Sequence, residues 1–418
     1  MPSTRRATAK QAVESKEKSN PTWGAGGLIQ NRELGSLVLM ILCPVFVLTF
    51  NYIIRAHDGS FVAFYNYVLK SNSVLKLFSE ICPTPLDPLA LKMIFAYSAF
   101  ELFLMKVVPG KRFTSTITPT GHLPVYKANG LQCYTITIIT VFALYIFDIF
   151  NPAIVYDNMG KLLSSMNMLA LCLCAFLTVK GLNFPSTKDA GSNGSLIVDF
   201  FWGTELYPRV FGFDIKQFTN CRFGMMFWQV GILCYGIKQY ETLGYLSSSM
   251  LVSIVVQTVY ITKFFWWETG YFCTMDIQHD RAGYYLCWGC LVWVPSMYTI
   301  HSYFLVEHPV LLSPVVTAAM LVAGVFSVSF SSHRKTFSHP TRHYRNPPLR
   351  CGAIMTATGK GKNSALPEAE RRFGDPFLIT PLRSTPQKMV RESQSTWQIA
   401  SMILTLSLRI VTLRVCPL

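Results

Sequence analysis

The chain has 418 residues, of which 51% are hydrophobic, 14% aromatic and only 14% charged. Soluble globular proteins carry about 25% charged residues, so this composition excludes a chain built of several soluble domains. So low a charge content also excludes an intrinsically disordered protein. The unusual feature that remains is a formal net charge of +15.

The positive charge is concentrated near the C-terminus. Residues 1–35 hold six Lys and Arg against three Asp and Glu, a net charge of +3, and residues 36–330 hold 17 against 15, a net charge of +2. Residues 331–418 hold 14 against 4, a net charge of +10. Because the long middle is nearly neutral, we expect no nucleic-acid partner. Basic ends of this kind are typical of tails that face an anionic membrane leaflet.

Apolar stretches of membrane-spanning length, about 20 residues, recur along the middle of the chain. They predict an all-α, polytopic membrane helix bundle with about eight spans, at residues 36–54, 89–108, 131–150, 162–179, 223–237, 246–265, 284–305 and 309–330. The segment 61–78 is too polar to span and predicts an amphipathic stretch lying at the membrane interface. Membrane lipid is therefore an expected partner.

The Lys and Arg residues of the short loops predict the orientation, because such residues favour the cytosolic side. Loops 109–130, 180–222 and 266–283 are richer in them than loops 151–161 and 238–245. We therefore expect a multi-pass protein with a cytosolic N-terminus. Its predicted parts are a cytosolic basic tail at 1–35, a transmembrane body at 36–330 and a basic tail at 331–418.

Ionisable residues are densest between the sixth and seventh predicted spans. Residues that could supply protons are Glu268, Tyr271, Asp276, His279 and Asp280, and aromatic residues surround them. Carboxylates within aromatic walls suit proton transfer to a flat apolar ligand. The alternative interpretation is an interfacial aromatic belt with accompanying charges.

Two further segments precede the third and fifth predicted spans. Glu205 lies four residues before Arg209, a spacing that also suits a simple surface ion pair. Asn129, after a turn that contains Gly121, is predicted to cap the next helix. Cys287 and Cys290 form a lone CxxC, which predicts no metal site without a second pair. The chain contains no Rossmann fingerprint and no P-loop.

Taken in order, several motifs resemble the sterol reductase family of the endoplasmic reticulum, and most of all its plant-type delta-7 branch. They comprise Pro109-Gly110, Thr118-Pro-Thr-Gly121, Tyr126 with Asn129-Gly-Leu-Gln132, Gly203-Thr-Glu-Leu-Tyr-Pro-Arg209, Phe213-Asp-Ile-Lys216, Phe218-Thr-Asn-Cys-Arg-Phe-Gly-Met-Met226, Ile237-Lys-Gln-Tyr240, Phe264-Phe-Trp-Trp-Glu268, Trp293-Val-Pro295 and His308-Pro-Val310. The resemblance covers about residues 25–326. It implies about ten spans of bilayer-crossing length.

The resemblance also implies the reaction, an NADPH-dependent reduction of the C7–C8 double bond of a 5,7-diene sterol. An acid protonates one alkene carbon, and the nicotinamide delivers hydride to the other. On this basis Glu268, Tyr271, Asp276, His279 and Asp280 are candidate catalytic residues. The candidate substrate-binding residues are Trp266, Trp267, Tyr284, Tyr285, Glu205 and Arg209.

Residues 331–418 depart from the family pattern, since the segments that supply most of its cofactor pocket are missing there. A shifted reading frame, a retained intron or a faulty gene model would each produce such a tail. No family cofactor ligand can therefore be transferred to this chain, and its cofactor-binding residues stay unknown. The alternatives are a delta-14 sterol reductase and a non-catalytic sterol-binding or interaction protein. A transporter is a more remote alternative, because no paired broken helices in related halves are evident.

Overall fold

A computed structural model describes residues 32–338 except Asn72, Thr116 and Pro119, with side chains as far as Val328. The chain divides into two compact units, Met1–Ser329 and Phe330–Leu418. All residues described with side chains belong to the first unit. The predicted basic tails at 1–35 and 331–418 lie almost wholly outside the described residues.

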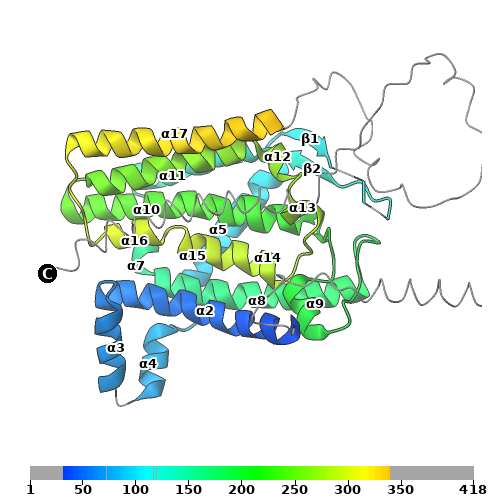
Figure 1. Ribbon diagram of the computed structural model, residues 1–418, viewed down its shortest axis with the longest axis horizontal. Coiled ribbons are helices and arrows are strands. Elements are labelled where there is room, and N and C mark those ends of the chain that lie inside the picture. Colours follow the sequence, from blue (N-terminus) through cyan, green and yellow to red (C-terminus); the bar gives the residue numbers. More distant parts are fainter. Residues whose placement is uncertain (1–31, 72, 116, 119, 339–418) are drawn as a thin grey trace, which may run out of the picture. The chain divides into compact units, whose positions relative to one another are not determined.

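The first unit is a bundle of long helices joined at both ends by short helices and small strand pairs (Figure 1). The long helices are α2 (Arg32–His57), α5 (Pro88–Val107), α6 (Gly130–Ile146), α8 (Met159–Asn183), α10 (Met225–Leu243), α11 (Ser248–Trp266) and α17 (Pro314–Ser338). Four described helices, α2, α5, α8 and α11, are long and apolar enough to cross a membrane, and α6 and Pro314–Val328 are shorter apolar helices. All eight predicted spans are helical over most of their length, which confirms the all-α class.

Two of the predicted spans contain π-helical turns. The π-helix η1 (Gln217–Gly224) leads directly into α10, and the seventh span is divided into α14 (Tyr284–Trp288), the π-helix η2 (Gly289–Trp293), α15 (Val294–Met297) and α16 (Ile300–Leu305). The two π-helices pack against each other. Gly224 permits this approach, since an added Cβ there would lie 2.5 Å from the carbonyl oxygen of Cys290. π-Helical turns are rare and occur often at functional sites.

The remaining elements are short. They are α3 (Phe61–Lys70), α4 (Val74–Ile81), α7 (Ile154–Asp157), α9 (Leu196–Trp202), α12 (Glu268–Tyr271) and α13 (Met275–Gln278), with strands β1 (Lys111–Thr114), β2 (Val125–Ala128), β3 (Arg209–Val210) and β4 (Phe213–Asp214). The strands form two antiparallel pairs, β1 with β2 and β3 with β4. The apolar core between α5, α6, α10 and α11 includes Cys133, Met226, Ile232 and Ile261, all of them fully buried.

Candidate functional site

Three loops gather at one end of the bundle (Figure 1). They carry the β1–β2 pair, α9, and the short helices α12 and α13, and the N-terminal end of α2 lies at this end as well. These are the three loops that are rich in Lys and Arg. The structure therefore places these loops at the same end of the bundle as the start of α2, and their cytosolic orientation stays a prediction.

Lys216 holds the loop that carries two of the predicted carboxylates. Its side chain is fully buried. Its Nζ donates to the backbone carbonyl oxygens of Asp276 at 3.1 Å, Ile277 at 2.6 Å and Asp280 at 2.7 Å. The ammonium also lies 5.2 Å from the centroid of the Tyr207 ring, within cation–π range. Lys216 thus fixes the C-terminal end of α13, where carbonyl oxygens favour a cation.

Asp276 and Asp280 have raised pKa values. Burial raises the pKa of Asp276, and burial together with the neighbouring Asp276 charge raises that of Asp280 to about 6. Burial lowers the pKa of Lys216 to about 8, against the opposing influence of Asp214, Asp280 and Asp276. A carboxyl group with a pKa near 6 can hold and release a proton near neutral pH.

Next to this loop is a buried aromatic cluster formed by Tyr126, Tyr207, Cys221, Tyr271, Phe272 and Ile277. The Tyr126 ring stacks on Phe272 with a centroid distance of 4.6 Å. The hydroxyl groups of Tyr126 and Tyr271 have no hydrogen-bond partner among the described residues, and neither does the buried Oδ2 of Asp214. Buried polar atoms are normally bonded to protein or to water. These three atoms are therefore able to take a new hydrogen-bond partner.

Glu268 lies instead in a buried ion pair. Its Oε1 accepts from Nη1 of Arg222 at 2.6 Å, and its Oε2 accepts from the backbone N–H of Gly130 at 2.8 Å. Arg222 is completely buried and also donates from Nη2 to Oδ1 of Asn129 at 2.8 Å. Both oxygens of Glu268 are thus occupied, and proton donation from this residue would require one of these contacts to break.

The predicted capping role of Asn129 is wrong. Asn129 occupies the N-cap position of α6, but its side chain makes no capping hydrogen bond. Its Nδ2 donates to the carbonyl oxygen of Val108 at 2.9 Å, and its Oδ1 accepts from Arg222. A buried guanidinium is a stronger partner for the amide oxygen than a backbone N–H.

Glu205 and Arg209 do not form the simple surface pair that their spacing suits. Glu205 is buried, and it accepts from Nζ of Lys180 at 2.7 Å and from the backbone N–H of Ser186 at 2.5 Å. Arg209 is exposed and donates from Nη2 to the carbonyl oxygen of Val125 at 2.7 Å. Glu205 therefore joins the end of α8 to the loop after α9, and Arg209 joins β3 to β2.

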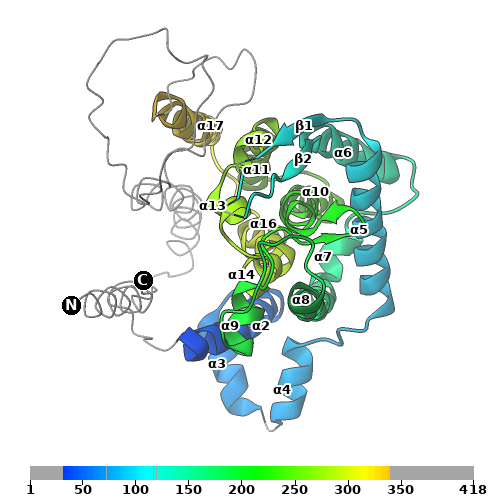
Figure 2. The same cartoon turned by 90° about the vertical axis from the view of Figure 1, so that its right-hand side faces the viewer.

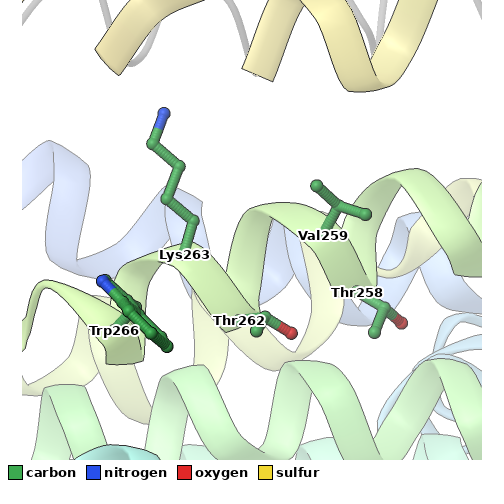
Figure 3. Close-up of a pocket in the computed structure, with 5 residues that line it drawn as sticks. All are labelled: Thr258, Val259, Thr262, Lys263 and Trp266. Carbon is green, nitrogen blue, oxygen red and sulfur yellow. The ribbon is translucent and has the colours of Figure 1, made fainter. Parts of the chain in front are cut away.

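The four predicted aromatic substrate residues form two groups. Trp266 and Trp267 lie at the end of α11, and Trp266 is 77% exposed. Trp266 lines an open groove of about 320 Å³ together with Thr258, Val259, Thr262 and Lys263 (Figure 3). The Nζ of Lys263 donates to the carbonyl oxygen of Val328.

Tyr284 and Tyr285 belong to the second group, at the start of α14, where they pack against α9. Tyr284 is buried and stacks on Trp288 with a centroid distance of 5.0 Å. Tyr285 is partly exposed and lies 5.2 Å from the ring of Trp202. His279, the remaining catalytic candidate, is exposed at the end of α13.

Sequence reasoning assigned no role to Lys216 or Arg222, although both lie in the quoted motifs. Each is a long cation in a largely apolar segment, and such a residue is seldom buried without a partner. That signal could have identified both as parts of a polar network. Their partners could not be predicted, because Glu268 and the carbonyl groups of α13 are more than 40 residues away along the chain.

The described residues contain no group of three or more His, Cys, Asp or Glu side chains that could hold a metal ion. A dinucleotide phosphate needs cations or free backbone N–H groups for its phosphates. Arg209 is bonded to Val125, and Arg281 donates to the carbonyl oxygen of Gly191 at 2.7 Å. Each guanidinium has five N–H donors, so these contacts leave donors that could still meet a phosphate; no cofactor-binding residue and no cofactor step is assigned.

Comparison with known proteins identifies the family. The model of the ergosterol biosynthesis ERG4/ERG24 family matches residues 29–362. The chain belongs to this family. The match extends beyond residue 326, where the resemblance was expected to end.

Curated relatives agree with this assignment. The chain is 50% identical to a 7-dehydrocholesterol reductase of Arabidopsis thaliana over 339 residues, 79% of this chain and 78% of the relative. It is 34% identical to a 7-dehydrocholesterol reductase of Xenopus laevis over 79% of this chain and 74% of the relative. A delta(14)-sterol reductase of Methylotuvimicrobium alcaliphilum is 30% identical over 65% of this chain and 62% of the relative.

Proposed function

We propose that this chain reduces the C7–C8 double bond of a 5,7-diene sterol in sterol biosynthesis. The observation that carries the proposal is the 50% identity to a 7-dehydrocholesterol reductase over 79% of the chain. The membrane helix bundle supports it, because a sterol substrate partitions into the bilayer beside the protein. NADPH is the reductant that the family resemblance implies.

Reduction of an alkene adds a hydride and a proton. The described residues include candidates for supplying the proton. We place proton supply on Asp280, with Asp276 as its neighbouring carboxylate and Tyr271 near Asp276. Burial and the neighbouring carboxylate raise the pKa of Asp280 to about 6, so that part of its population is protonated near neutral pH. Tyr271 is buried and has an unpartnered hydroxyl among the described residues, which leaves it free to contact a ligand.

We propose different roles for the other predicted site residues. Glu268 and Glu205 are held in buried ion pairs and fit best as residues that shape the site. Tyr284 and Tyr285 provide an aromatic wall on α14, while Trp266 and Trp267 are open to the surroundings of α11. His279 and Arg209 are exposed at the same end of the bundle and could contact the polar part of a ligand.

The test is a product analysis. Membranes of a host that lacks sterol delta-7 reduction are prepared with and without this chain, supplied with 7-dehydrocholesterol and NADPH, and analysed by gas chromatography with mass spectrometry. Formation of cholesterol that depends on the chain and on NADPH supports the proposal. Binding of the sterol without turnover would favour the non-catalytic alternative.

A delta-14 reductase is the second candidate, because a delta(14)-sterol reductase is 30% identical over 65% of this chain. The same membranes supplied with a delta-14 sterol distinguish the two activities. Saturation of the delta-14 bond with no change in the 5,7-diene would exclude the delta-7 assignment.

We also propose that the protein resides in the endoplasmic reticulum with its N-terminus in the cytosol. The support is that the three loops rich in Lys and Arg lie at the same end of the bundle as the start of α2 (Figure 1). An N-terminal epitope tag that becomes accessible to antibody only after the internal membranes are permeabilised would refute this orientation.

A further inference from the structure

The helices α3 and α4 form a hairpin with an unusual surface. Neither helix contains a buried residue, although most of their residues are apolar. Their exposed large apolar side chains are those of Phe61, Val62, Tyr65, Leu69, Val74, Leu75 and Phe78. Val74 is 82% exposed. An apolar surface of this kind on a folded protein indicates contact with another apolar phase.

The chain places this hairpin at the membrane boundary. It lies between the end of α2 at His57 and the start of α5 at Pro88, and both of these helices are candidate membrane spans. The hairpin lies at the end of the bundle away from α12 and α13, and it runs across the direction of the long helices (Figures 1 and 2). A segment that joins two spans at the same membrane face, and that lies across them, is parallel to the bilayer plane.

Each helix of the hairpin has two distinct sides. On α3 the exposed apolar residues Phe61, Tyr65 and Leu69 recur every four residues and so share one side. Lys70 lies five residues after Tyr65, which places it on nearly the opposite side. On α4, Val74 and Phe78 are four residues apart, and Lys76 lies two residues from each, which places it on nearly the opposite side.

The third side of the hairpin is fixed to the bundle. The hydroxyl groups of Tyr52 and Tyr67 both donate to Oε2 of Glu80, at 2.8 and 2.6 Å. The ring of His57 lies 5.1 Å from that of Tyr67, and the hydroxyl of Ser164 donates to the carbonyl oxygen of Pro83 at 2.5 Å. These contacts join α2, α3, α4 and α8, so the apolar side cannot rotate inward.

We propose that the α3–α4 hairpin is an interfacial membrane anchor whose occupant is the lipid bilayer. The side with Phe61, Leu69 and Phe78 lies in the boundary between headgroups and acyl chains, as amphipathic in-plane helices do. Lys70 and Lys76 flank the turn and extend their ammonium groups toward the lipid phosphates. The hairpin thereby fixes the depth at which the ends of α2 and α5 lie in the membrane.

The test compares introduced cysteines on the two sides. Phe78→Cys reports the apolar side of α4, and Lys76→Cys is its matched control on the same helix. Tyr65→Cys and Lys70→Cys form a second pair on α3. The purified full chain is reconstituted in phosphatidylcholine vesicles, with a charged maleimide or N-ethylmaleimide present on both sides of the membrane. Alkylation of each introduced cysteine is measured on its own peptide by mass spectrometry, because the chain has native cysteines, including Cys82.

We expect the charged maleimide to modify the apolar-side cysteine at least about tenfold more slowly than its control, because a charged reagent is excluded from lipid and a thiol in apolar surroundings ionises less readily. N-Ethylmaleimide, which enters the bilayer, should narrow that difference. Equal rates with the charged reagent at both positions would place the apolar side in water and overturn the proposal. If the apolar-side cysteine is protected from the charged maleimide in native membranes but not after reconstitution, a protein partner covers that side. If its protection decreases as the lipid-to-protein ratio rises, a second copy of the chain covers it. Either result would also overturn it.

Discussion

The buried ion pair between Arg222 and Glu268 permits a sharp stability prediction. We consider Glu268→Gln, which keeps the size of the side chain and removes its charge. The Arg222 side chain is 0% exposed and that of Glu268 is 3% exposed, with 2.6 Å between Nη1 and Oε1. The substitution leaves a buried guanidinium without its counter-charge, which costs about 3–5 kcal/mol. At about 2 °C per kcal/mol for a large domain, the apparent Tm falls by about 6–10 °C.

The control is a second Arg–Glu pair of similar geometry that is exposed. Arg55 and Glu307 approach to 2.9 Å with side chains 36% and 44% exposed. Glu307→Gln should lower the free energy of unfolding by no more than about 1 kcal/mol. Both variants are purified in one detergent, and their thermal unfolding is followed by circular dichroism. If Glu268→Gln melts with the unsubstituted protein, or if Glu307→Gln is the less stable of the two, the reasoning from burial fails.

Four further outcomes are expected. If Asp280 supplies the proton, turnover falls about tenfold per pH unit above its pKa of about 6, and Asp280→Asn removes this pH dependence. The same raised pKa makes the free energy of unfolding decrease as pH rises from about 4 to 6, because the folded state binds the proton more tightly than the unfolded state, whose Asp has a pKa of about 3.9. Urea unfolding at several pH values measures this slope, which should become smaller in Asp280→Asn. Lys216→Met leaves three carbonyl groups without their donor and should abolish turnover. Lys216→Arg retains a cation and should retain part of the turnover. Equal activity of the two variants in the sterol assay would refute a positioning role for Lys216. Gly203→Ala places a Cβ 2.6 Å from the carbonyl carbon of Ala282 at a residue with a positive φ of 93°, and it should lower the free energy of unfolding by about 1–3 kcal/mol. Gly191 also has a positive φ, of 151°, but an added Cβ there meets no atom within 4 Å. Comparing the thermal unfolding of Gly203→Ala and Gly191→Ala therefore separates the cost of the steric clash from the cost of the backbone conformation.

The helices were predictable from the sequence because apolar runs of spanning length are a strong signal. The run 131–150 marked α6, and the polar residues of 61–78 marked a segment that does not span. The break in the seventh span was less visible. Pro295 has no backbone N–H to donate within that span, but the π-helical turn at Gly289–Trp293 packs against η1, and no local sequence pattern reports that contact.

The candidate site was predictable only in part. The cluster of carboxylates and aromatic residues around Asp276 could be located by its density, since ionisable residues are sparse elsewhere in the membrane body. The distinction between Glu268 and Asp280 could not be made, because it depends on which side chains come near each carboxylate in space. Glu268 has Arg222 and Gly130 as partners, whereas Asp280 is near a second carboxylate. Asn129 shows the same effect, since a distant arginine displaced a local capping bond.

The contact between Arg222 and Glu268 also constrains the order of events during synthesis. The two residues are 46 positions apart. At a translation rate of about 5–20 residues per second, Arg222 therefore leaves the ribosome about 2–9 s before its carboxylate partner. During that interval the Arg222 guanidinium lacks the counter-charge that Glu268 supplies in the folded chain, so the ion pair can form only after the sixth span has been synthesised.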